Sequence, residues 1–155
     1  MIVIGSDHTG IKLKKEIIKY LNKNNIGTID VTDFENQDGD DYPDIAYKIS
    51  KKTLSENLIG IAICGTGIGI SMACNKVIGI RAAVCTDKYM AEMTRKDNDA
   101  NILCLGSRLD ETNVFEIVNA FISTEFQGGR HARRVNKITE IEKSEREGVE
   151  YGISI

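Results

Sequence analysis

Short apolar runs alternate along the chain with segments in which hydrophobic residues recur every three or four positions. Such runs are typical of buried strands, and the longer spacing is typical of amphipathic helices. The first helix carries its apolar residues on one face and lysines on the other, and Gly27 is expected to stop it. The pattern predicts strands at residues 1–6, 29–31, 58–63, 80–85 and 102–105. It predicts helices from residue 11 and at 43–55, 70–75, 88–96, 111–122 and 130–147, with an exposed acidic loop at 33–42.

A strand followed by a helix occurs five times in this order, without an internal repeat or a low-complexity segment. Parallel strands need crossover helices of this kind, which cover both faces of the sheet. A chain of 155 residues is most simply a single domain, here residues 1–155. The predicted fold class is α/β, a three-layer α/β/α sandwich around a five-stranded parallel sheet, with one further helix at the C-terminus.

That last helix, at residues 130–147, follows two glycines and begins with basic residues. Arg130 and Arg134 share a face of its first turn, where the helix dipole already places positive charge. A bound anion such as a phosphate would resolve this conflict; the alternative is a solvated basic turn paired with surface acids. Apolar residues at positions 135, 138 and 141 continue this helix. Because it is appended after a complete α/β unit, we expect it to pack on a second subunit, although the apolar spacing does not identify the partner.

Composition narrows the function classes. The net charge of -3 gives no indication of nucleic-acid binding, and no apolar run approaches the ~20 residues that span a bilayer. The chain starts directly with a strand rather than a signal peptide, so we expect a cytoplasmic protein with no membrane partner. Of four cysteines, Cys85 and Cys104 are predicted to be buried thiols, and no disulfide framework is expected. His8 and His131 lack zinc-ligand spacing, so neither a metal nor a cofactor is predicted.

The sequence ICGTGIGIS at residues 63–71 ends a predicted strand in a cysteine followed by glycines at every second position. Glycines allow the backbone N–H groups of such a loop to converge on negative charge, and the same field would favour a thiolate at Cys64. One loop could then hold a base or nucleophile beside a cradle for an oxyanion. The alternative is a buried cysteine at a strand end followed by a tight turn.

Other polar residues follow the ends of neighbouring strands. Asp7, His8, Cys64 and Thr66 should converge at one edge of the sheet, where open α/β sheets bind ligands. Asp7 and His8 would form an acid-base pair or a hydrogen-bonding clamp; alternatively, Asp7 caps the first helix and His8 is merely exposed. Asn98 precedes the fifth strand and so belongs to the opposite edge, from which a neighbouring subunit would have to supply it.

A thiolate base, an oxyanion nest and a phosphate grip suggest proton transfer beside a carbonyl of a phosphorylated metabolite. The loop does not suit a phosphatase, because Ile70 stands where an arginine would hold the transferred group. It also spells G-x-G-x-G where the dinucleotide fingerprint needs G-x-G-x-x-G, although Asp87 after the next strand keeps that alternative open.

The chain resembles the ribose-5-phosphate isomerase B family, which includes allose- and galactose-6-phosphate isomerases. The resemblance is carried, in the family's order, by GSDHTG at 5–10, DYP at 41–43, ICGTGIGIS at 63–71, NK at 75–76, GIRA at 79–82, NDAN at 98–101, GSR at 106–108, GGRH at 128–131 and RRV at 133–135. It implies a Rossmann-like sandwich that forms a homodimer or homotetramer with active sites between subunits. It also implies interconversion of ribose 5-phosphate and ribulose 5-phosphate, a step of the non-oxidative pentose phosphate pathway.

The resemblance also assigns roles to individual residues. It makes Cys64 the base that moves a proton between C1 and C2, and Ile70 instead of a glutamate places the chain in the cysteine branch of the family. By the same likeness, Asp7 binds the sugar hydroxyls. The residues implied to hold the enediolate are Thr66 and the amides of Gly65, Gly67, Ile68, Gly69 and Ile70. Those implied to bind phosphate, hydroxyls or the pocket wall are His8, Arg130, Arg134, Asn98, Arg108 and Tyr42.

One position departs from the family. Asp97 stands where the family commonly has the histidine that opens the furanose ring. Asp97 or Asp7 could open the ring, or the ring could open in solution. The same change leaves open which sugar phosphate the protein prefers. The rival activities are a hexose-6-phosphate isomerase of the same mechanism and, more distantly, a non-catalytic module that binds a nucleotide or phosphate.

Overall fold

The computed structural model describes residues 1–32, 40–108, 113–148 and 151–152. Its strands are β1 (Ile2–Ser6), β2 (Thr28–Asp30), β3 (Ile59–Cys64), β4 (Ala82–Val84) and β5 (Ile102–Gly106). Its helices are the 3-10 helix η1 (His8–Gly10) and α1 (Ile11–Lys23), α2 (Tyr42–Glu56), α3 (Ile68–Cys74), α4 (Lys88–Asn98), α5 (Val114–Ser123) and α6 (Arg130–Glu147). Most of the predicted acidic loop and the expected start of a helix at residue 111 lie outside the described residues.

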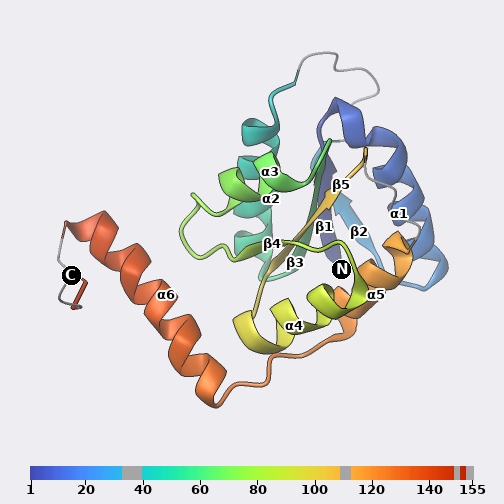
Figure 1. The fold of residues 1–155 in the computed structure, drawn as a ribbon. Helices are drawn as coiled ribbons and strands as arrows, with labels where there is room; N and C mark the ends of the chain where they lie inside the picture. Colours follow the sequence, from blue (N-terminus) through green and yellow to red (C-terminus); the bar gives the residue numbers. More distant parts are fainter. Residues whose placement is uncertain (33–39, 109–112, 149–150, 153–155) are drawn as a thin grey trace.

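The five strands are parallel and lie in the order β2-β1-β3-β5-β4 (Figure 1). β3 is central: Ile63 at its end pairs with Ser6 of β1, and Cys64 pairs with Gly106 of β5. The predicted α/β class and five-stranded parallel sheet are confirmed. The carboxyl ends of β1, β3 and β5 therefore share one edge of the sheet, the edge at which such folds bind ligands.

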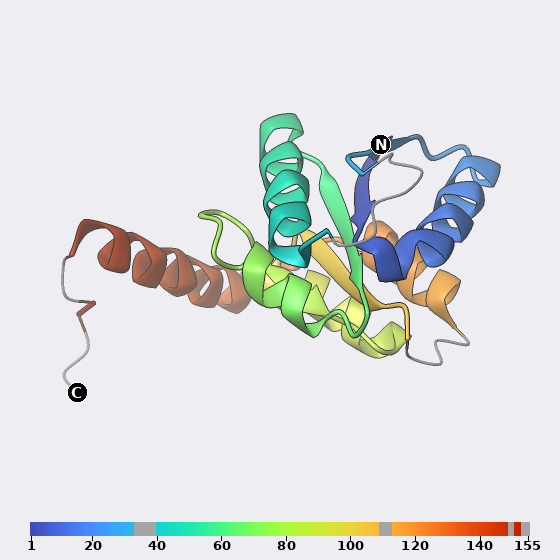
Figure 2. The same ribbon diagram turned by 90° about the horizontal axis from the view of Figure 1, so that it is seen from above.

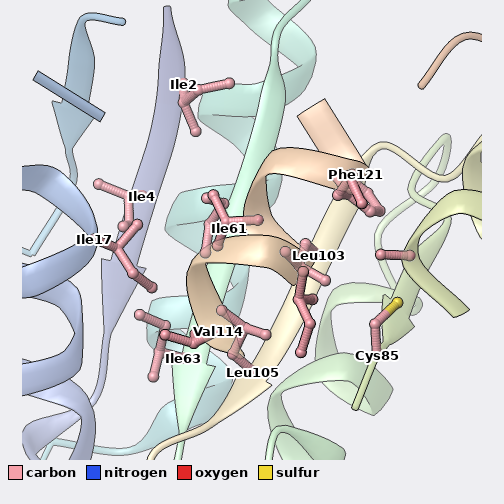
Figure 3. Close-up of a cluster of buried hydrophobic side chains, with 14 of the residues drawn as sticks. Ile2, Ile4, Ile17, Ile61, Ile63, Cys85, Leu103, Leu105, Val114 and Phe121 are labelled. Atoms are coloured by element: carbon pink, nitrogen blue, oxygen red, sulfur yellow. The ribbon is translucent and has the colours of Figure 1, made fainter. Parts of the chain in front are cut away.

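Each face of the sheet packs against its own layer of helices. Ile61 and Ile63 point to the face covered by α1, α4 and α5, where Phe121 is buried among strand residues (Figure 3). Ala62 and Cys64 point to the opposite face, covered by α2 and α3. Successive strand residues alternate between faces, so this alternation follows directly from the strand geometry. Because both faces of the sheet are buried in the core, the strand sequences are continuous apolar runs.

Several boundaries differ from the sequence predictions. α1 ends at Lys23, earlier than Gly27, because Asn24 and Asn25 already turn the chain, the latter with φ 59°. β4 covers only Ala82–Val84 of the expected 80–85, as an edge strand paired on one side. Lys14 does not lie on the solvent face of α1 as expected: it is buried and ion-paired with Asp30 at 2.7 Å.

α6 leaves the three-layer body of the domain (Figure 2). Its first turn lies against α4, since the backbone N–H of Gln127 just before it donates to the carbonyl of Lys96 at 3.1 Å. Further along, the Glu142 carboxylate accepts a hydrogen bond from the Gly79 N–H at 3.1 Å. Val135 is buried, whereas Ile138 and Ile141 are exposed. None of the helices in the described ranges is long and apolar enough to cross a membrane.

Candidate active site

Cys64 closes β3 at the carboxyl edge of the sheet. Its side chain is only 4% exposed, and its Sγ accepts a hydrogen bond from the backbone N–H of Gly67 at 3.2 Å. The turn between them needs glycine, because Gly67 has φ 77° and a Cβ there would lie 3.0 Å from the carbonyl carbon of Leu105. An amide aimed at a sulfur is the contact that a thiolate accepts best, so the loop is built to hold negative charge beside Cys64.

Two glycines of the loop let other side chains lie directly on its backbone. The Arg108 guanidinium covers Gly65, where a Cβ would come within 3.1 Å of its Cζ and Nε. The Tyr42 ring covers Gly69, where a Cβ would lie 2.9 Å from its Cζ. Arg108 is held by its own N–H, which donates to the Gly65 carbonyl at 2.9 Å. A cation therefore lies on the first part of the loop, and a phenol lies on the first turn of α3.

The remaining loop residues offer backbone rather than side chains. Thr66 is exposed, and its Oγ1 accepts a hydrogen bond from the Ile68 N–H at 3.3 Å. Ile70 is fully buried in the core beneath the loop, whereas Ile68 is 52% exposed. What Ile70 can present to a ligand is thus its amide, and Thr66 is the hydroxyl nearest to solvent on this loop.

Asp7 follows β1 and lies on the same edge. It is 5% exposed, and its Oδ1 accepts hydrogen bonds from the Thr9 N–H at 2.9 Å and the Thr9 hydroxyl at 2.6 Å. Ser107, after β5, extends this network by donating to the Thr9 hydroxyl at 3.3 Å. Asp7 thus caps η1, the short turn before α1, whereas the N-cap of α1 itself is Gly10. Within the described residues both bonds use Oδ1, so Oδ2 is the oxygen that a ligand would meet.

His8 is exposed and is oriented by a residue that the sequence did not single out. Its Nδ1 and its backbone nitrogen both lie 2.9 Å from Oδ1 of Asp40. The hydrogen bond with Asp40, together with the nearby charge of Asp7, raises the pKa of His8 above its ordinary value. A cationic imidazole beside an open edge can bind a phosphate. Asp40 lies in a generally acidic stretch, where no local signal distinguishes it from its neighbours.

A second cluster of predicted site residues lies at the other edge of the sheet. Asp97 and Asn98 end α4 just before β5 begins, whereas Cys64 is paired with the last residue of β5. Four residue steps of β5 separate the two edges, about 13 Å at ~3.3 Å per residue. Arg130 and Arg134 open α6 beside this cluster, and neither makes an ion pair within the described part of the chain. One chain therefore does not bring these residues together with Cys64.

All four cysteines are free and buried, as predicted for Cys85 and Cys104. Burial raises the pKa of the Cys85 thiol to about 12, which makes it inert toward ordinary thiol chemistry. Among the described residues, no three histidine, cysteine or acidic side chains gather into a group that could hold a metal ion. The carboxyl edge offers a sulfur, two carboxylates, an imidazole, a guanidinium, a phenol, a hydroxyl and a row of amides.

Known proteins resemble this chain along nearly its whole length. The profile of the family described as Ribose/Galactose Isomerase matches residues 2–138. Ribose-5-phosphate isomerase B of Escherichia coli is 40% identical over 144 residues, covering 92% of this chain and 96% of that protein. The solved ribose-5-phosphate isomerase B of Clostridium thermocellum has a TM-score of 0.88 at 51% identity, covering 93% of this chain and 98% of the other. That of Mycoplasma genitalium, solved with bound ribulose-5-phosphate, has a TM-score of 0.86 at 41% identity, covering 92% and 95%.

Proposed function

The chain belongs to the ribose/galactose isomerase family, and we propose that it is an aldose-ketose isomerase that interconverts D-ribose 5-phosphate and D-ribulose 5-phosphate. One observation carries the proposal: the Cys64 sulfur, at the end of the central strand, accepts an amide hydrogen bond from the glycine loop. A relative of the same fold was solved with ribulose-5-phosphate bound, which supports the choice of substrate.

In the proposed reaction Cys64 acts as the base. Its thiolate takes the proton from C2 of the open-chain aldose, and the C1–C2 unit becomes an enediolate. The thiol then returns the proton to C1, while the hydroxyl proton passes from O2 to O1. Thr66 and the amides of residues 65–70 hold the enediolate oxygens, because they line the loop into which the sulfur faces. Asp7 binds the sugar hydroxyls through Oδ2.

The phosphate group is assigned to His8, Arg130 and Arg134, and a sugar hydroxyl to Asn98. Arg108 and Tyr42 line the pocket from the two glycines that they cover. His8 lies at the edge with Cys64, but the two arginines and Asn98 lie at the opposite edge. A complete site therefore needs a second copy of the chain, and we propose a homodimer, or a tetramer built from such dimers. A cytoplasmic location stays a prediction.

A groove along α6 supports this assembly. It has a volume of about 870 Å³ and lies between α6 and the edge strand β4, with Ile78, Ile138 and Ile141 in its wall. These three isoleucines are 51%, 47% and 44% exposed, so aliphatic surface in the groove is left uncovered within one chain. Asn98 lines the same groove, so a second copy seated in it would lie next to the polar cluster.

The second candidate is a hexose-6-phosphate isomerase of the same mechanism. It stays a candidate because Asp97 replaces the histidine that opens the sugar ring in the family. Comparing kcat/KM on ribose 5-phosphate and allose 6-phosphate separates the two activities. Running the reaction in D₂O tests the mechanism: deuterium at C1 or C2 of the product supports proton transfer through solvent-exchangeable sulfur. Full activity without label would favour a hydride shift, and no turnover on any sugar phosphate would leave a binding module.

A further inference from the structure

Two hydroxyl side chains connect the carboxyl ends of β1 and β5. The Thr9 hydroxyl donates to Oδ1 of Asp7 at 2.6 Å, and the Ser107 hydroxyl donates to Oγ1 of Thr9 at 3.3 Å. β1 and β5 are not neighbours in the sheet, because β3 lies between them. A side-chain connection between them therefore passes the end of the central strand, at which Cys64 lies.

The main chain holds both ends of this connection against β3. The Ser107 N–H donates to the carbonyl of Cys64 at 2.8 Å. On the other side of the strand, the Asp7 N–H donates to the carbonyl of Ile63 at 3.1 Å. These bonds fix where the backbone of Asp7 stands relative to the sulfur, but they do not fix the direction of its carboxylate.

The direction of each hydroxyl bond follows from the chemistry of the groups. An ionised carboxylate only accepts hydrogen bonds, so the single hydroxyl proton of Thr9 points to Asp7. Thr9 is then left as an acceptor for the proton of Ser107. The 2.6 Å contact has the length of a charge-assisted O–H···O⁻ bond, about 2.5–2.7 Å, whereas 3.3 Å is long for two hydroxyls. Thr9 is therefore the stronger of the two links.

We propose that Thr9 is a positioning residue for the isomerisation: its hydroxyl fixes the carboxylate plane of Asp7 so that Oδ2 faces the sugar, and Ser107 supports it. This inference rests on the proposed isomerase function. The outer torsion of an aspartate is soft, so one hydrogen bond to Oδ1 leaves the position of Oδ2 loose. Oδ1 of Asp7 receives two, from the N–H and from the hydroxyl of Thr9, and together they hold the plane.

The structural alternative is that these bonds only cap η1. The cap needs no more than the Thr9 N–H, which donates to Oδ1 of Asp7 at 2.9 Å. Thr9→Val keeps this donor and the branched shape of the side chain, and it removes the hydroxyl alone. The variant therefore separates the positioning of the carboxylate from the folding of the turn.

Two non-reactive ligands report on the sugar and phosphate parts of the site separately. Ribitol 5-phosphate has the hydroxyls of an open-chain sugar but no carbonyl, and inorganic phosphate has only the phosphate group. By calorimetry, Thr9→Val should weaken binding of ribitol 5-phosphate about tenfold and leave phosphate binding unchanged, and Thr9→Ser should restore most of the loss. Ser107→Ala should cause a smaller loss in the same direction. Thr53→Val removes a buried hydroxyl that has no partner among the described residues, and it should change neither affinity.

A double-mutant cycle tests whether Thr9 acts through Asp7. In an Asp7→Ala background, Thr9→Val should cost no further affinity for ribitol 5-phosphate. An additive loss in this background, an equal loss for inorganic phosphate, or no loss in the single variant would overturn the inference. These measurements do not depend on turnover, so the isomerase assay of the unaltered chain judges the proposed function independently.

Discussion

The sulfur of Cys64 lies 3.2 Å from the backbone nitrogen of Gly67, three residues further along the same loop. The donor belongs to the backbone, so no side-chain rotamer has to be ordered to keep it aimed at the sulfur. The positive φ of Gly67 fixes its direction. The proposed base and the start of its oxyanion cradle are therefore built from one tight turn.

Removing the sulfur should remove the reaction. We expect Cys64→Ala to lower kcat by about 10²–10⁴-fold, because no neighbouring group of the loop can take the C2 proton. Affinity for a phosphate ligand should be nearly unchanged, as measured by calorimetry. Cys85→Ala is the matched control: that thiol is buried and its raised pKa keeps it protonated, so turnover should persist. Substantial turnover by Cys64→Ala would rule out the assigned base.

The turn itself can be tested with two glycines. Gly67 and Gly128 have φ of 77° and 66°, so alanine is strained at both, by about 1–2 kcal/mol. Only at Gly67 would the new Cβ meet the backbone, 3.0 Å from the Leu105 carbonyl carbon; nothing lies within 4 Å at Gly128. Urea unfolding should show both losses, whereas kcat should fall only for Gly67→Ala. Equal kcat values in the two variants would show that the position of the Gly67 N–H does not matter for catalysis.

The proposed dimer, in which each site is shared between two chains, predicts complementation. Arg134→Ala should raise KM for phosphorylated sugars but not for free sugars, since it removes a phosphate contact. When Cys64→Ala and Arg134→Ala chains are unfolded and refolded together, half of the dimers are mixed and each has one intact site. At substrate concentrations far below the raised KM of Arg134→Ala, where neither variant alone turns over appreciably, activity should then return to about a quarter of the unaltered level.

The matched control for this experiment combines Cys64→Ala with Asp7→Asn, two changes at the same edge of one chain. Every site of a mixed dimer then carries one defect, so no activity should return. Equal recovery in the two mixtures, or none in either, would contradict a site formed by opposite edges of two chains.

The His8–Asp40 contact predicts a pH dependence. The hydrogen bond from His8 to Asp40 raises the pKa of His8, so the imidazole keeps its proton to a higher pH than usual. Phosphate binding through His8 should be complete below this pKa and weaken as the pH rises through it. Asp40→Asn should move both the NMR titration of His8 and the rise in KM to lower pH. Asp41→Asn, an exposed neighbour, should move neither; an unshifted titration in Asp40→Asn would disprove the coupling.

Stability should depend on the buried lysine of α1. Lys14 donates to the Thr32 carbonyl at 2.8 Å and pairs with Asp30, which is itself 19% exposed. Lys14→Met leaves that carboxylate without its partner and should lower the free energy of unfolding by about 3 kcal/mol, the lower end for a buried pair. Lys15→Met, on the exposed side of the same turn, should change it by less than about 0.5 kcal/mol. Coinciding urea midpoints for the two variants would contradict this prediction.

Local sequence patterns were sufficient to place Cys64 and Asp7 at one edge, because each follows an apolar run whose end is visible in the sequence. The opposite placement of Asn98 also followed from strand order. Asp40 and Ser107 could not be found in this way: their contacts with His8 and Thr9 span 32 and 98 residues and depend on tertiary packing. Lys14 was misplaced because helical periodicity does not show which polar position a neighbouring strand will cover.

The position of α6 also makes the expected activity depend on protein concentration. Ile138 and Ile141 are exposed on α6. Arg130 and Arg134, in the first turns of the same helix, lie at the opposite edge of the sheet from Cys64. If the proposed dimer forms the site, a single chain lacks the residues to complete one catalytic pocket. Specific activity would then fall when the protein is diluted below the dissociation constant of the dimer. That constant would depend on how tightly these isoleucines pack against the second chain.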